Sequence, residues 1–319
     1  CALPICLDRL DEDDVRIRPS RSNSRPRSKN RPDHSEALPA TVMTVDRGRF
    51  RLLDGDGDEH FAVKARELGR KGIVVGDLVE VVGMTSSTES AAADREDLAR
   101  IVRRAPRATV LRRTADDDDP DERVIVANVD QLAIVVATAE PEPSFGLIDR
   151  ALVAAYDAGI RPLILMTKSD LAPASTVRDM YRPLGFPVVD ARKSANSVRQ
   201  HLKDHQTVLL GLSGVGKSTL VNRLIPSAER TTGGVNSVTG KGRHTSTSVL
   251  ALPLSFGGWI VDTPGIRSFG LAHVDSARVL EAFPDLAQAT KDCPRGCSHI
   301  DDHCPAGDRS EEHTSELQS

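Results

Sequence analysis

Hydrophobic and polar positions alternate with period two in the first third of the chain. Short runs of this kind are separated by Gly and Asp turns, at residues 41–46, 49–53, 60–65 and 77–83. The spacing is typical of half-buried β-strands. The segment 71–83 is similar to the closing hairpin of an OB-type barrel, so we predict an OB-fold domain over residues 40–105. Such a barrel either binds RNA backbone through its arginines and lysines or is purely structural.

The pattern changes after residue 105 to continuous apolar runs that alternate with an amphipathic segment. Four-to-nine-residue apolar runs begin near residues 131, 162, 186, 207 and 258, and residues 146–159 have helical periodicity. Alternation of buried strands and helices is the mark of a parallel α/β sheet. We therefore predict an α/β domain over residues 106–272.

Composition and charge are those of a globular protein without a membrane-spanning segment. The chain has 319 residues, of which 39% are hydrophobic and 28% charged, and its net charge is −4. No apolar run approaches the roughly 20 residues that span a bilayer, and no secretory signal is visible. We expect a cytoplasmic monomer of several domains with no membrane partner.

Both ends of the chain differ from the rest. Residues 309–319 and 1–5 match translations of the two strands of a common sequencing adapter, so we expect a native C-terminus cut off near Asp308. Residues 15–32 carry arginine and lysine but no acid, interleaved with Ser, Asn and Pro. We expect residues 1–39 to hold an artefactual start and a disordered basic arm, which is either a solubilising tail or an RNA-binding arm.

A phosphate-binding loop is predicted where an apolar strand runs into a helix. The pattern G-x-x-x-x-G-K-[ST] is satisfied there. Its residues are Gly211, Leu212, Ser213, Gly214, Val215, Gly216, Lys217, Ser218 and Thr219. Backbone N–H groups would surround the phosphates, Lys217 would neutralise them, and Ser218 would ligate Mg²⁺.

A γ-phosphate switch is predicted after the next buried strand. Asp262 can hold Mg²⁺, and the amide of Gly265 can bind the γ-phosphate. Residues 231–248 are rich in Gly, Ser and Thr, and are either a mobile loop or a switch that orders on Mg²⁺. Thr245 is the first choice for the Mg²⁺-binding hydroxyl, followed by Thr247.

A guanine-binding site is predicted from Thr167, Lys168 and Asp170. Asp170 can accept hydrogen bonds from the ring N–H and the amino group of guanine, whereas adenine would leave the carboxylate unpaired. Thr167 stands where Asn is usual. Asp190 and Ala191 would occupy the usual Ser-Ala position, where the Ala amide contacts the guanine oxygen.

The guanine motif precedes the phosphate motif, which reverses the usual order. A parallel sheet can be cut at one loop and rejoined at another without moving its nucleotide site. We therefore expect a circularly permuted P-loop GTPase domain.

The motifs TKSD, GLSGVGKST, GRHTST and DTPG, followed by a Cys/His cluster and preceded by an OB-like domain, resemble the RsgA/YjeQ family. The resemblance implies a GTP hydrolase that acts in late maturation of the small (30S) ribosomal subunit and is stimulated by it. Its partners would be that subunit, its rRNA, GTP and GDP. It also implies that His244 positions the attacking water, because Ile266 stands where many GTPases have Gln.

Three of the five cysteines cluster near the C-terminus, which in a cytosolic chain favours a metal over a disulfide. The family has a zinc site there. Cys293, Cys297, His299 and Cys304 are the expected Zn²⁺ ligands, and His303 competes for a place. We predict a truncated zinc-binding module over residues 273–308.

Two rival functions remain open at this point. One is an rRNA-binding scaffold in which GTP occupancy acts as a switch with little hydrolysis, and Ile266 favours it. The other is a P-loop ATPase, which Asp170 disfavours.

Overall fold

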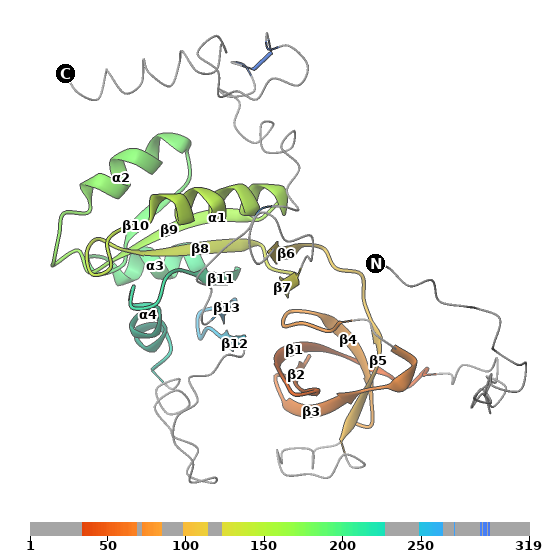
Figure 1. Cartoon of the computed structure of the whole chain (residues 1–319). Helices are drawn as coiled ribbons and strands as arrows, with labels where there is room; N and C mark the ends of the chain where they lie inside the picture. Colours follow the sequence, from red (N-terminus) through yellow and green to blue (C-terminus); the bar gives the residue numbers. More distant parts are fainter. Residues whose placement is uncertain are drawn as a thin grey trace, which may run out of the picture. The chain divides into compact units, whose positions relative to one another are not determined.

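The computed structural model describes five continuous segments of the chain, residues 34–68, 72–84, 98–113, 123–226 and 249–263. It also describes the single positions Leu271, Gln288, Thr290, Lys291 and Cys293. Within these residues the chain forms a β-barrel and a parallel α/β sheet (Figure 1). No helix of the described residues is long and apolar enough to cross a membrane.

The barrel is built from five strands and one short 3₁₀ helix. These elements are β1 (Leu38–Asp46), β2 (Arg49–Asp54), β3 (Glu59–Lys64), η2 (Arg66–Leu68), β4 (Leu78–Val82) and β5 (Ala99–Arg104). The strand order is β1-β2-β3-β5-β4, and β4 pairs again with β1 and closes the barrel. This closed five-stranded barrel agrees with the OB-type domain predicted from the alternating pattern.

Alternate residues of each barrel strand point inward, as the period of two requires. Val42, Leu52, Ala62, Val81 and Ile101 are buried in a common core. Charged residues such as Arg51, Glu80 and Arg100 lie at outward positions and interrupt the apolar runs in the sequence.

The second part is an α/β sheet preceded by a small hairpin. Its elements are β6 (Val110–Arg113), β7 (Arg123–Ala127), β8 (Gln131–Ala137), α1 (Phe145–Asp157), β9 (Arg161–Thr167), α2 (Ser175–Tyr181), η3 (Arg182–Leu184), β10 (Val188–Asp190), α3 (Ala195–Leu202), β11 (Gln206–Leu210), α4 (Lys217–Leu224), β12 (Leu250–Pro253) and β13 (Trp259–Asp262). The strand order is β10-β9-β8-β11-β13-β12, with β12 antiparallel and the other strands parallel.

The central strand β8 is buried at every position because helices cover both of its faces (Figure 1). Leu132, Ile134 and Val136 pack in one cluster with residues of α1. Ala133 and Val135 point the other way, into a second cluster with residues of α3 and α4. A strand buried on both faces is a continuous apolar run in the sequence, which is the pattern seen here.

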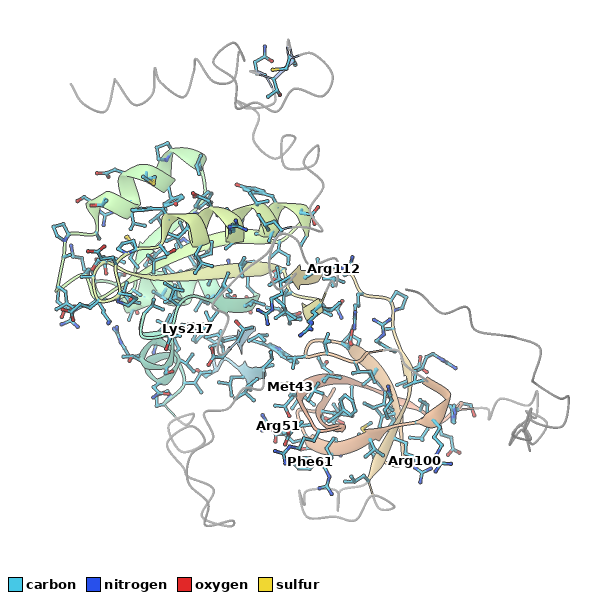
Figure 2. All side chains as sticks on the ribbon, viewed as in Figure 1. Met43, Arg51, Phe61, Arg100, Arg112 and Lys217 are labelled. Carbon is cyan, nitrogen blue, oxygen red and sulfur yellow. The ribbon has the colours of Figure 1, made fainter. Side chains whose placement is uncertain are left out.

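A β-bulge in β1 joins the barrel to the α/β sheet. The pairing of β1 with β2 shifts register between Val42 and Thr44, and Thr44 also pairs with Leu250 of β12. The bulge turns Met43 out of the barrel core and into the cluster that contains Val261 of β13 (Figure 2). Bulges commonly redirect a side chain in this way.

Polar contacts hold the same junction. Asp77 is fully buried and accepts hydrogen bonds from Arg107 Nε (2.6 Å) and Nη2 (2.8 Å) and from the N–H of Val74 (2.8 Å). Asn128 donates from Nδ2 to the carbonyl of Gly76 (2.8 Å). Gly76 has φ of 84°, and a Cβ there would collide with the carbonyl oxygen of Ala127, so only glycine fits.

Met43→Ala should destabilise the α/β sheet although Met43 belongs to a barrel strand. Met43 is 1% exposed, and its truncation should cost about 2–5 kcal/mol through lost burial and a residual cavity. Trp259, the single tryptophan, packs against the same cluster, so its fluorescence during urea unfolding measures the effect in the sheet.

Met180→Ala is the matched control, because Met180 is 53% exposed and its loss should change stability by about 0.5 kcal/mol or less. An unchanged Trp259 transition in Met43→Ala would show that the barrel and the sheet do not share this core.

Candidate nucleotide-binding site

The loop between β11 and α4 has the backbone of a phosphate cradle. Gly211 must be glycine because a Cβ would collide with the carbonyl oxygen of Val135 in β8. Gly214 and Gly216 have positive φ angles of 82° and 96°. Gly216 caps α4, so the free N–H groups of the first helical turn lie at the end of this loop.

Lys217 lies across the cradle. Its Nζ donates to the carbonyls of Gly211 (2.5 Å) and Leu212 (2.9 Å). Burial lowers the pKa of Lys217, and the nearby Asp262 carboxylate partly offsets this effect. Ser218 and Thr219 follow on the exposed first turn of α4. The cradle therefore combines a cation, two hydroxyls and backbone donors.

Asp262 fits the predicted Mg²⁺ ligand. It ends β13 and pairs in register with Leu209 of the neighbouring β11, so it lies beside the start of the cradle. Its Oδ1 is buried and has no hydrogen-bond partner among the described residues. Burial raises the pKa of Asp262, whereas Lys217 and the N–H of Thr263 lower it. An unpaired carboxylate oxygen at the end of the strand next to the cradle suits Mg²⁺, which prefers oxygen ligands and retains several waters.

The predicted guanine site lies at the carboxyl end of β9. Lys168 has a positive φ of 55°, and its Nζ donates to the carbonyl of Glu140. Thr138, just after β8, donates from Oγ1 to the carbonyl of Lys168 (2.7 Å). Asp170 follows with its side chain 42% exposed, open to a ligand.

Thr167 links this site to the cradle. Its Oγ1 lies 2.5 Å from the carbonyl oxygen of Val215 in the cradle and 3.3 Å from that of Val136. A Cβ on Gly216 would lie 3.6 Å from Thr167 Oγ1. The two motifs meet although β8 lies between their strands in the sheet.

The loop after β10 is fixed by hydrogen bonds of the Asp190 side chain and of the backbone. Asp190 Oδ1 accepts hydrogen bonds from Ser169 Oγ (2.9 Å) and from the N–H of Arg192 (3.1 Å). The N–H of Ala191 donates to the carbonyl of Met166 (2.8 Å), so a guanine oxygen would have to share or replace that bond. The contact of Ala191 with guanine stays a prediction.

Several contributing residues lie outside the sequence motifs. Ser169 and Arg192 are adjacent to predicted residues, but their contacts cross between two loops. Arg223 of α4 donates to the carbonyl of Ala191 (3.2 Å) and links the helix of the cradle to the guanine loop. The sequence places Arg223 on the helix that begins at Lys217. That position does not predict that Arg223 contacts Ala191.

Some predicted residues lie outside the described part of the chain. These are His244, Thr245, Gly265, Cys297, His299 and Cys304. Cys293 is described, but without the other three expected ligands. Among the described residues no group of three or more His, Cys, Asp or Glu side chains is placed to hold a metal. The switch residues and the zinc set stay predictions.

The chain is similar to proteins of the RsgA GTPase family. Residues 104–272 match the family model described as RsgA GTPase. A relative from Pseudomonas syringae pv. syringae (strain B728a), named small ribosomal subunit biogenesis GTPase RsgA, is 37% identical over 258 residues, 75% of this chain and 74% of the relative. A protein of the same name from Pseudomonas savastanoi pv. phaseolicola is 41% identical over 210 residues, 62% of this chain and 60% of its own length.

Two solved structures share the fold. YjeQ from Thermotoga maritima aligns with a TM-score of 0.60 at 23% identity, over 87% of this chain and 92% of that structure. YloQ, described as a circularly permuted GTPase, aligns with a TM-score of 0.58 at 23% identity, over 89% and 92%. The predicted circularly permuted fold is therefore confirmed for the α/β sheet.

Thr167→Val should weaken binding of GDP because it removes the hydroxyl that holds Val215 while keeping the side-chain shape. Loss of one such hydrogen bond corresponds to about 0.5–1.5 kcal/mol, or about 2- to 12-fold in Kd. Isothermal titration calorimetry measures the change.

Thr207→Val is the control, because Thr207 donates to Gln131 (2.8 Å) at the opposite end of the same sheet. It should lower stability and leave the Kd for GDP unchanged. Equal weakening in both variants would mean that Thr167 acts through general stability.

Proposed function

The chain belongs to the RsgA GTPase family, and from this premise we propose that it hydrolyses GTP as a late maturation factor of the small ribosomal subunit. The observation that carries the proposal is the contact of Thr167 with Val215, because it joins a guanine motif and a phosphate motif into one site. The names of the two Pseudomonas relatives support the ribosomal role.

Each described part of the site has a role in this reaction. The carboxylate of Asp170 accepts the two N–H groups of guanine, and the amides of the cradle bind the β-phosphate. Lys217 neutralises phosphate charge as it develops. Ser218 and Asp262 would hold Mg²⁺, with Thr245 as the proposed third residue. When bound, Mg²⁺ would neutralise phosphate charge.

Water must be positioned by a residue other than the usual Gln, since Ile266 has no polar atom in its side chain. We assign this role to His244, which lies between the cradle and Asp262 in the sequence. Intrinsic turnover is then slow, and contact with the small subunit accelerates it by ordering the segment around His244.

The outer face of the barrel supports an RNA partner. Arg51 of β2 lies opposite Phe61 of β3 in the strand register, and Arg100 of β5 lies opposite Val63 (Figure 2). Arg51 forms an ion pair with Glu59, with 3.3 Å between Nη1 and Oε2, and Arg100 is exposed. Cations around one half-buried aromatic ring suit phosphate contact with a single stacked base.

The C-terminal cysteines belong to the same proposal. Cys293, Cys297, His299 and Cys304 would hold one structural Zn²⁺ next to the γ-phosphate switch. The second candidate function, an rRNA-binding scaffold with GTP occupancy as its switch, is favoured by Ile266 alone.

Hydrolysis of GTP and of ATP, each with and without purified small ribosomal subunits, separates these functions. We expect GTP turnover that rises with the subunits, ATP turnover near background, and loss of GTP turnover in Lys217→Ala. Asp170→Asn should relax the preference for guanine because an amide replaces an acceptor. Tight GTP binding without turnover under either condition would support the scaffold instead, and ATP turnover would indicate an ATPase.

His244→Ala should leave the Kd for GTP unchanged and abolish the acceleration by small subunits. The reason is that His244 is assigned to the water and not to the nucleotide. Single-turnover kinetics with saturating subunits measure this effect, and His201→Ala, in α3 and outside the switch segment, is a control for loss of a histidine. Full acceleration in His244→Ala would assign the water to another group.

A further inference from the structure

The proposed guanine-binding carboxylate is already engaged by a side chain of this protein. Arg192 Nε lies 3.3 Å from Asp170 Oδ1. The side chains of Arg192 and Asp170 are 59% and 42% exposed, so neither is locked in place by packing. The contact is an exposed ion pair, which can open and close rapidly.

The position of Arg192 is set by a buried turn. Asp190 is 9% exposed, and its Oδ1 accepts the N–H groups of Arg192 (3.1 Å) and Lys193 (3.2 Å). The same oxygen accepts Ser169 Oγ at 2.9 Å, and Ser169 is the chain neighbour of Asp170. Asp190 therefore ties the two loops together and presents Arg192 to Asp170.

Guanine and Arg192 would both bind the carboxylate of Asp170. The ring N–H and the amino group of guanine donate side by side, which takes both oxygens of a carboxylate in one plane. The guanidinium of Arg192 is a charged donor that occupies Oδ1 of that carboxylate. A base that takes both oxygens must displace Arg192 or pull the carboxylate away from it.

Resting on the proposed guanine site, we propose that Arg192 is a specificity-determining residue that competes with guanine for the Asp170 carboxylate. The competition acts before the nucleotide binds, so it slows association and leaves dissociation unaffected. Adenine does not use Asp170, so the competition weakens GDP binding but not ADP binding. Arg192 thereby sets how strongly guanine is preferred.

The test is stopped-flow binding of a fluorescent GDP analogue to the full chain and its Arg192→Gln variant. We expect association to become about two- to fivefold faster at low ionic strength, as the loss of an exposed ion pair predicts, with an unchanged dissociation rate. The difference should shrink near 1 M salt, where charges are screened beyond about 3 Å. Arg192→Lys should restore slow association, and the dissociation constant of ADP, obtained by competition and corrected for the affinity of each protein for the analogue, should be the same for both proteins.

Lys193→Gln is the matched control. It removes the same charge from the next residue, whose Nζ lies 3.9 Å from Asp190 rather than from Asp170, and should leave the association rate at that of the unmodified chain. In an Asp170→Asn background, Arg192→Gln should have no effect.

Three outcomes would overturn the competition. They are an unchanged association rate in Arg192→Gln, an equal acceleration in Lys193→Gln, and faster dissociation, which would place Arg192 on the bound nucleotide. A wrong assignment of the guanine site gives a different result from a wrong assignment of Arg192. In that case the unmodified chain would bind GDP no better than ADP.

Discussion

The hydrogen bond from Thr167 to Val215 is the contact on which the nucleotide site depends. The guanine motif ends β9 and the cradle follows β11, and the whole of β8 separates these two strands in the sheet. Parallel register brings their carboxyl ends to one edge, with Ala137 opposite Thr167 and Ile134 opposite Leu210. The hydroxyl of Thr167 then closes the remaining gap, so the order of the motifs along the chain has no influence on the site.

Permutation does change what is attached to the site. The strand β12 comes directly after the predicted switch segment, and its Leu250 pairs with Thr44 of the barrel. The buried Met43 packs with the core of the sheet, and the buried Asp77 binds Arg107, which leads from the barrel toward β6. Because packed junctions shift between discrete arrangements more readily than they deform, a rearrangement of the barrel would act directly on β12, the strand that follows residues 231–248.

Local signals predicted much of this molecule from its sequence. The period of two identified four of the five barrel strands, β1 to β4, but not β5. The apolar run of β8 with the Gly pattern of residues 211–216 identified the central sheet and the cradle. The sheet order, the bulge at Met43 and the partners of Arg192 and Arg223 were not predictable. Each of these depends on residues that are distant in sequence, and neither periodicity nor a motif encodes which distant partner a side chain meets.

The base and phosphate subsites are coupled by two links of different kinds. Thr167 holds the cradle through a backbone carbonyl, and Arg223 reaches from α4 to the carbonyl of Ala191 in the guanine loop. A displacement of α4 would therefore act on the loop after β10, which contains the predicted guanine contact Ala191. Because Asp190 fixes the same loop to Ser169, the displacement would also act on Asp170, the chain neighbour of Ser169. These contacts thus link the predicted base and phosphate subsites, although the chain encodes them in reverse order.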